Sequence, residues 1–445
     1  MTNKDIVTII GGGLAGCEAA FQLLRQGRRV RLFEQRPRSK TPAHTGGNLA
    51  ELVCSNSFRS NSLSSAPGLL KAEMRILGSL TMEAADNCRV PAGQALAVDR
   101  ERFSSYTEER LSSHGNLEII REEIREIPQE EPVIVATGPL TSEALAENLA
   151  ALIGVKYLHF YDAIAPIVFA DSIDEEIIFR ASRYNKGEGE YINCPMNQEE
   201  YLSFLAALRS AEQYPIHDFE GERFFEGCLP IEEMAVRGDD VMRFGPLKPV
   251  GLPDPRTGKE PYAVVQLRQD DIAAEHYNIV GFQTRMRQAE QKRVVREIPG
   301  LQNAQFARLG QMHRNTYINA PEVLEPTYQV RGKPGLFIAG QLSGVEGYVE
   351  SASSGLAAGL YMAQFLGEGK VDPLPPTTAI GALSYYVANA ESKIFQPMNV
   401  TFGLLQGEEG IPHRPKRKRR EAQAERALNN VREWAGRHDI VTRVD

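Results

Sequence analysis

The stretch DIVTIIGGGLAGCEAAFQLLRQGRRVRLFEQRP, residues 5–37, decides the fold class of this chain. Residues 6–10 form a continuous apolar run rich in β-branched side chains, which predicts a strand covered on both faces of a parallel sheet. A G-x-G-x-x-G turn follows, and the helical pattern after it ends near Gly27. Residues 30–33 then predict a second strand, with Glu34 at its end.

This strand, turn and helix together predict a dinucleotide site. The first glycine would make the turn, the second would let the backbone approach a pyrophosphate, and the third would let helix and strand pack closely. The start of the helix offers N–H groups and a positive dipole end to phosphates. An acidic residue about twenty positions further on can accept hydrogen bonds from an adenosine ribose. The expected cofactor-binding residues in this stretch are Gly11, Gly12, Gly13, Leu14, Ala15, Gly16 and Glu34.

Length and composition limit the remaining possibilities. A chain of 445 residues is too long for one ordinary core, so two domains, or one interrupted by another, are expected. No apolar run is long enough to span a bilayer, and an odd number of scattered cysteines, five, suits a reducing cytoplasm better than a disulfide framework. HExxH, paired CxxC and P-loop patterns are absent, so we expect no metal site and no nucleoside triphosphate site. The lack of a long apolar run leads us to expect no membrane association.

The formal net charge of −8 argues weakly against nucleic acid as a partner, but the charge is unevenly spread. The run HRPKRKRR, residues 413–420, is strongly basic. It is either a solvated tail or a patch that contacts phosphates.

Two cysteines lie in polar or turn-forming surroundings. Cys54 lies in LAELVCSNSFRSNS, residues 49–62, among Ser, Asn and Arg side chains that suit a reactive thiolate better than a buried thiol. Cys228 lies in FFEGCLPIEE, residues 224–233, where glycine and proline mark a turn that can present a thiol. The other three, Cys17, Cys88 and Cys194, are expected to pack in cores.

Two later segments resemble parts of the two-part FAD fold of the glutathione reductase type. PVIVATGP, residues 132–139, resembles the strand that returns to the sheet. GLFIAGQLSGVEGYVESASSGLAAG, residues 335–359, resembles the strand, loop and helix that close over the flavin, and it supplies Gly340 and Gln341 as further cofactor-binding residues. The middle of the chain differs in sequence pattern from both ends. It contains a capping box at Asn197 and a proline-rich loop at residues 245–261.

The expected architecture is therefore an α/β, glutathione-reductase-type FAD-binding Rossmann-like fold interrupted by an α+β insertion domain. We expect the first part of the FAD-binding domain at residues 1–156 and the insertion domain at residues 157–315. The second part would occupy residues 316–445 and include the basic C-terminal segment.

An ordered set of motifs makes a more specific resemblance. It consists of GGGLAGCEAA with Glu34, ELVCSNSFRS, NCPMN, FEGCLPIE, MHRNTYIN and AGQLSGVEGYVESA, and it extends from about residue 6 to residue 406. The set resembles the folate- and FAD-dependent tRNA (uracil-5-)-methyltransferase family. The resemblance implies methylation of C5 of the T-loop uridine in the T-arm of tRNA to ribothymidine. Methylenetetrahydrofolate would donate the carbon, reduced FAD the electrons, and NAD(P)H would reduce the flavin.

The resemblance also implies roles for individual residues. Cys228 would add to C6 of uracil, and Cys54 would be the partner thiol, acting as a base or as a carrier of the carbon. The residues themselves leave the reverse order open. His313 would stack on the pterin of the folate.

Two alternatives remain open at this point. A related, larger flavin and folate family modifies the wobble uridine of tRNA, but it carries an additional helical domain and a Ser-Cys-Asn-Pro type loop where this chain has Val53-Cys54-Ser55-Asn56. A flavin oxidoreductase that acts on a small molecule is the other, and the acidic net charge favours it.

Overall fold

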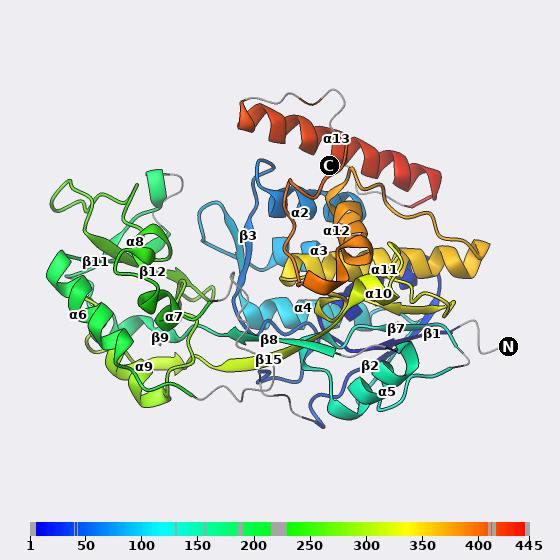
Figure 1. Ribbon diagram of the computed structural model, residues 1–445, viewed down its shortest axis with the longest axis horizontal. Helices are drawn as coiled ribbons and strands as arrows, with labels where there is room; N and C mark the ends of the chain where they lie inside the picture. The colour runs from blue at the N-terminus through cyan, green and yellow to red at the C-terminus, as the bar shows by residue number, and fades with distance from the viewer. Residues whose placement is uncertain are drawn as a thin grey trace.

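The structure, a computed structural model, describes residues 6–39, 41, 43–129, 131–154, 157–185, 190–214, 229–407, 411 and 415–440. It contains two bodies joined by a two-stranded ribbon (Figure 1). The larger body is built on a parallel sheet and the smaller body on an antiparallel sheet. In these described ranges, no helix combines the length and apolar character needed to cross a membrane.

Five parallel strands form the main sheet of the larger body, in the order β16-β7-β1-β2-β6. The central strand β1 buries Val7, Ile9 and Ile10 to 3% exposure or less, as expected for a strand covered on both faces. The predicted strand, glycine turn and helix are present, and the predicted α/β fold class is confirmed. The elements are β1 (Ile6–Ile10), α1 (Leu14–Arg25), β2 (Arg29–Phe33), β6 (Leu117–Ile120), β7 (Val133–Val135), β16 (Leu336–Ile338) and α11 (Tyr348–Glu368).

Small residues bring α1 and α11 into close contact. A Cβ atom on Gly355 would lie 2.1 Å from the carbonyl oxygen of Ala15, and one on Gly359 would lie 2.7 Å from that of Ala19. Such distances are too short for a side chain, so glycine is required at both positions of α11. This contact places the late helix directly against the helix that follows the N-terminal glycine turn.

Helix α13 (Lys416–Arg437) packs on α2 (Ala66–Ile76) at the outside of the larger body (Figure 1). Its Trp434 is fully buried and donates its indole N–H to the carbonyl oxygen of Asp372 over 3.0 Å. The basic run therefore enters this helix at Lys416. Residues 416–418 are exposed, as expected for a solvated run, but they form a helix and not a tail. The other elements of this body are β3 (Ser57–Ser60), α3 (Leu80–Asn87), β4 (Arg89–Val90), β5 (Ala95–Val98), α4 (Arg100–Ser112), η2 (Gly138–Leu140), α5 (Glu143–Ile153), α10 (Ala320–Val323), η6 (Gln341–Ser343), α12 (Ala379–Asn389) and η7 (Ser392–Ile394).

The smaller body is a six-stranded antiparallel sheet in the order β10-β11-β12-β13-β9-β14, with an apolar core of its own. Cys194 belongs to this core at 0% exposure, as expected for a packing thiol. The predicted capping box is confirmed, because Asn197 and Glu200 exchange side-chain to backbone hydrogen bonds at the start of α6. The elements are β9 (Ile167–Phe169), η3 (Ala170–Ser172), β10 (Phe179–Arg180), η4 (Arg183–Asn185), β11 (Tyr191–Met196), α6 (Gln198–Arg209), α7 (Ile231–Val236), α8 (Val241–Phe244), β12 (Ala263–Gln269), β13 (His276–Ile279), α9 (Gln288–Val295) and β14 (Phe306–Arg308).

The ribbon between the bodies consists of β8 (Tyr157–Ala163) and β15 (Met312–Ile318), paired antiparallel along their whole length (Figure 1). The expected domain boundary at residue 157 falls on the first residue of β8, and the one at residue 315 falls inside β15. The chain therefore leaves the larger body on one strand of the ribbon and returns on the other.

Candidate functional site

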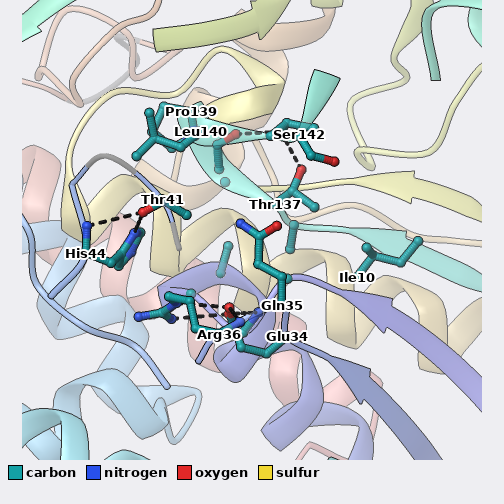
Figure 2. A pocket seen from close by; sticks show the side chains of 18 of the residues that line it. Ile10, Glu34, Gln35, Arg36, Thr41, His44, Thr137, Pro139, Leu140 and Ser142 are labelled. Carbon is teal, nitrogen blue, oxygen red and sulfur yellow. Dashed lines mark hydrogen bonds and ion pairs between the residues drawn. The ribbon is translucent and has the colours of Figure 1, made fainter. Parts of the chain in front are cut away.

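A pocket lies at the carboxyl ends of the parallel strands, the usual place for ligands in open α/β sheets. Its empty volume is about 1060 Å³, part of which is open to solvent. Figure 2 shows Glu34 and Arg36 on one side of it and Thr137 and Pro139 on the other. The expected cofactor-binding residues that line it are Gly11, Gly12, Gly13, Leu14, Ala15, Glu34, Gly340 and Gln341.

The glycine turn has the geometry that a pyrophosphate requires. Gly11 has a φ of +106°, and a Cβ atom there would lie 2.5 Å from the carbonyl oxygen of Ala136. A Cβ atom on Gly16 would lie 1.8 Å from the carbonyl oxygen of Gly11, so Gly16 packs beneath the turn. A Cβ atom on Gly13 would meet nothing within 4 Å, which leaves the backbone open to a ligand. The first N–H groups of α1 lack intrahelical acceptors and can bind an anion.

Glu34 is buried at the end of β2 and already forms a network. Its carboxylate accepts from the backbone N–H of Gly12 at 3.0 Å and from the Arg36 guanidinium at 2.9 Å. Arg36 also donates to Glu51 at 2.9 Å. Burial acts to raise the pKa of Glu34, but the hydrogen bonds and charge of Arg36 outweigh it and hold this pKa below its usual value. Glu34 is thus ionised and faces the pocket.

Gly340 and Gln341 form the wall contributed by the late segment. The backbone N–H of Gly340 donates to the hydroxyl of Ser354 at 2.7 Å, and the side-chain amide of Gln341 donates to Glu346 at 2.6 Å. These bonds fix the turn between β16 and α11 against the pocket. The late segment and the N-terminal glycine turn therefore form one site.

The loop of Cys54 adjoins this pocket through Tyr348. The Tyr348 hydroxyl accepts from the backbone N–H of Cys54 at 2.6 Å and from that of Ser55 at 3.1 Å. Tyr348 and Val53 both line the pocket, while Cys54 itself is half-buried beside it. Burial raises the pKa of Tyr348, so its hydroxyl stays neutral. The thiol predicted to be reactive therefore lies next to the predicted flavin site.

Two arginines act on the thiol of Cys54, in a neighbourhood that also holds the carboxylates of Asp270 and Glu51. Arg268 on β12 and Arg308 on β14 both lie within electrostatic range of the thiol. Burial lowers the pKa of each of these arginines. Positively charged groups beside a thiol stabilise the thiolate, which is the nucleophilic form. Cys17, Cys88 and Cys194, in contrast, are at most 3% exposed, and burial raises the pKa of each.

The structure describes little of the other two predicted site residues, Cys228 and His313. Cys228 lies outside the described residues. The backbone of His313 belongs to β15, where it pairs with Asp162 of β8, and its side chain lies outside the description. Among the residues that are described, no three His, Cys, Asp or Glu side chains gather as metal ligands would.

Sequence reasoning did not single out Arg36, Glu51 or Tyr348. Arg36 lies two residues after Glu34 in EQRP, so a charge partner for the acidic residue could have been proposed. The contact between Tyr348 and Cys54 joins residues 294 positions apart, and no local pattern predicts it.

Comparison with known proteins identifies relatives along nearly the whole chain. Residues 6–370 match the family model described as glucose inhibited division protein A. The methylenetetrahydrofolate–tRNA-(uracil-5-)-methyltransferase TrmFO of Lactobacillus delbrueckii subsp. bulgaricus is 56% identical over 97% of this chain and 98% of its own length. The protein of the same name from Moorella thermoacetica is 58% identical over 90% of this chain and 92% of its own length. The one from Heliobacterium modesticaldum is 56% identical over 98% of this chain and 100% of its own length.

Solved structures confirm the fold. Two crystal forms of Aquifex aeolicus GidA superpose with TM-scores of 0.71 and 0.72 at 18% identity. The two superpositions include 97% and 98% of this chain, and 73% and 76% of the GidA chain. The match therefore includes both bodies of the fold, while the GidA chain extends beyond it.

Proposed function

The chain belongs to the glucose inhibited division protein A family and to the methylenetetrahydrofolate–tRNA-(uracil-5-)-methyltransferases, and from that premise we propose that it methylates C5 of the T-loop uridine of tRNA to ribothymidine. The full-length identity to proteins of that name carries the proposal. The matches extend over 98% and 100% of those relatives' own lengths.

The pocket residues fit FAD. The start of α1 offers N–H groups to a pyrophosphate, and the open face at Gly13 lets one approach. Glu34 lies where a ribose hydroxyl would reach it. When bound, FAD would supply the electrons that convert the one-carbon unit of methylenetetrahydrofolate to a methyl group, with NAD(P)H as their source.

The cysteines would activate the uracil. C5 of uracil is a poor nucleophile, and a thiolate that adds to C6 converts the ring to an enolate whose C5 can attack the one-carbon unit. A base must then remove the C5 proton, and the electron pair of that C–H bond expels the thiolate from C6. We assign the addition to Cys228 and the role of base or carrier to Cys54. The arginines near Cys54 support the role of base or carrier given to it, because their positive charges favour a thiolate at the edge of the pocket.

The uridine must also reach the pocket. The T-loop uridine is held in the folded tRNA, so the enzyme has to extrude the base from its stack. His313 would then stack on the pterin of the folate that lies against the flavin.

The proposal is tested by incubating the flavin-loaded protein with unmodified tRNA transcript, methylenetetrahydrofolate and NADPH. Nucleoside mass spectrometry should find ribothymidine that maps to the T-loop. It should be missing with Cys54→Ala and Cys228→Ala and present with Cys88→Ala, which removes a buried thiol of the same body as Cys54. A flavin-loaded protein that yields no ribothymidine contradicts the proposal.

The order of the two thiols needs a separate measurement. A tRNA that carries 5-fluorouridine traps the enzyme covalently, because fluorine at C5 cannot be removed by the base. Cys228→Ala should abolish this adduct. An adduct of undiminished yield would reverse the assignment of Cys228 and Cys54.

A further inference from the structure

The loop that carries Cys54, residues 52–56, is held by side chains from three elements. Arg100 of α4 donates to the carbonyl oxygen of Leu52 at 3.2 Å. Tyr348 at the start of α11 accepts from two backbone N–H groups of the loop. The third side chain, Arg268, comes from β12 of the smaller body. The loop is therefore fixed by both bodies of the molecule.

Arg268 binds the two residues that directly follow Cys54. Its Nη2 donates to the hydroxyl of Ser55 at 2.7 Å, and its Nε donates to the side-chain oxygen of Asn56 at 2.9 Å. The side chain of Asn56 is fully buried and donates in turn to the carbonyl oxygens of Val98 at 3.1 Å and Gln269 at 2.9 Å. Asn56 thereby connects β5 of the larger body to the end of β12.

The charge of Arg268 needs an explanation. The residue is 8% exposed, and among the described residues no carboxylate oxygen lies within 4.0 Å of its guanidinium. Its acceptors are the neutral oxygens of Ser55, Asn56 and, at 3.4 Å, Asn278, while nearby Asp270 forms an ion pair with Arg100 at 3.0 Å. Burying a cation without a partner is costly. The groups that interact electrostatically with it and can carry a negative charge are Tyr191, Asp270 and the thiol of Cys54, and Cys54 is the one that belongs to this loop.

We infer that Arg268 is a positioning residue for Cys54: its two hydrogen bonds hold the loop in the conformation needed for the reaction with uracil, and its charge favours the thiolate. The inference deepens the proposed function and rests on it. It assigns to the smaller body, which carries Arg268, control over a thiol that belongs to the larger body.

Two substitutions separate the hydrogen bonds from the charge. Arg268→Lys keeps the charge but loses the fork that reaches Ser55 and Asn56 together. Arg268→Gln loses the charge as well. The matched control is Arg183→Lys, because Arg183 is a partly buried arginine of the same body that also donates to neutral oxygens, those of Lys248 and Gln266.

The first readout is the rate at which iodoacetamide alkylates Cys54 in the holoenzyme, followed by peptide mass spectrometry across a pH series. The other charged or titratable groups around Arg268 and this loop are Tyr191, Asp270, Arg100, Arg308, Tyr348 and Glu51, and all of them stay unchanged. Arg268→Gln should lower the rate at neutral pH about tenfold and move the pH profile upward, because one opposite charge is lost. Arg268→Lys should keep the wild-type profile, as should Arg183→Lys.

The second readout is steady-state methylation of tRNA. Both Arg268 variants should lower kcat about tenfold while KM for tRNA and the flavin absorbance stay near wild type, and Arg183→Lys should change none of these. Alkylation needs neither tRNA nor folate, so it tests Arg268 even where methylation itself fails. Wild-type alkylation and wild-type kcat in Arg268→Gln would overturn the inference.

If Arg268→Gln loses its flavin, the substitution has disturbed the fold, and its kcat no longer reports on Cys54. The variant Ser55→Ala then tests whether the contact positions the thiol. That variant removes one acceptor of Arg268 and keeps every charge. The inference expects it to bind flavin normally and to lower kcat severalfold. A Ser55→Ala enzyme with wild-type kcat would show that the contact does not position the thiol.

Discussion

A carboxylate has about four acceptor positions, and Gly12 and Arg36 fill those of Glu34. A ribose hydroxyl that binds Glu34 must therefore share or displace a contact from Arg36. The position of Glu34 after the second strand could be predicted from the sequence. A pairing with Arg36 could also have been proposed, but the bond from Gly12 and the link through Arg36 to Glu51 could not, because they depend on how the chain after β2 turns back over the pocket.

Glu34→Gln should weaken FAD binding about tenfold or more, because a hydrogen bond to a charged group contributes about 1.5–3 kcal/mol. The amide also loses the charge that balances Arg36. Flavin absorbance per protein after dialysis measures the effect. Glu131→Gln is the control. Glu131 lies just before β7, its carboxylate accepts a hydrogen bond from the hydroxyl of Thr8, and it does not line the pocket. Equal flavin retention in both variants would contradict the role given to Glu34.

Lys71 should make stability depend on pH. Its ammonium group is buried and donates to the carbonyl oxygens of Phe58 at 2.7 Å and Ser60 at 2.8 Å, and burial lowers its pKa from 10.5 to about 7. Between pH 7 and pH 10.5 the unfolded chain therefore binds more protons at this site than the folded chain. The Lys71 contribution to the free energy of unfolding rises with pH across that window, by at most about 1.4 kcal/mol per unit.

Urea midpoints at several pH values between these limits, compared for wild type and Lys71→Met, isolate that contribution. The wild-type midpoint should rise with pH relative to the variant. Parallel curves for the two proteins would show that Lys71 keeps an ordinary pKa in the folded state.

At the scale of elements, the sequence predicted β1, α1, β2 and the strand, loop and helix of residues 335–359 from their periodicity and glycines. It did not predict that α11 would pack on α1. The reason is physical: Gly355 and Gly359 matter only because Ala15 and Ala19 present backbone oxygens opposite them, and neither helix indicates its partner.

Gly355→Ala should separate α11 from α1 and loosen the flavin site between them. The new methyl group would meet the carbonyl oxygen of Ala15 at 2.1 Å, and relieving such overpacking typically costs about 1–3 kcal/mol. The midpoint temperature of thermal unfolding and the amount of flavin retained after dialysis should both fall. Gly367→Ala in the same helix is the control, because its methyl group would meet only Arg28 at 3.5 Å. Helix propensity alone would make both substitutions stabilising, so unchanged or higher stability and flavin retention in Gly355→Ala would contradict the role given to this contact.

At the scale of the whole molecule, the inserted middle segment could be expected from its change in composition, and the antiparallel body with its own core lies in that segment. The contacts between the bodies could not be expected. Arg268 and Asn56 meet across 212 positions of the chain, so their pairing depends on the placement of the entire smaller body. The candidate site is for this reason a property of the assembled fold.

The central claim is that a folate carbon becomes the methyl group of ribothymidine. Its most direct test supplies methylenetetrahydrofolate labelled with ¹³C in the methylene group and unmodified tRNA to the flavin-loaded protein with NADPH. We expect T-loop ribothymidine that carries the label, and none with Cys228→Ala. Ribothymidine without the label, or label found only outside the T-loop, would contradict it.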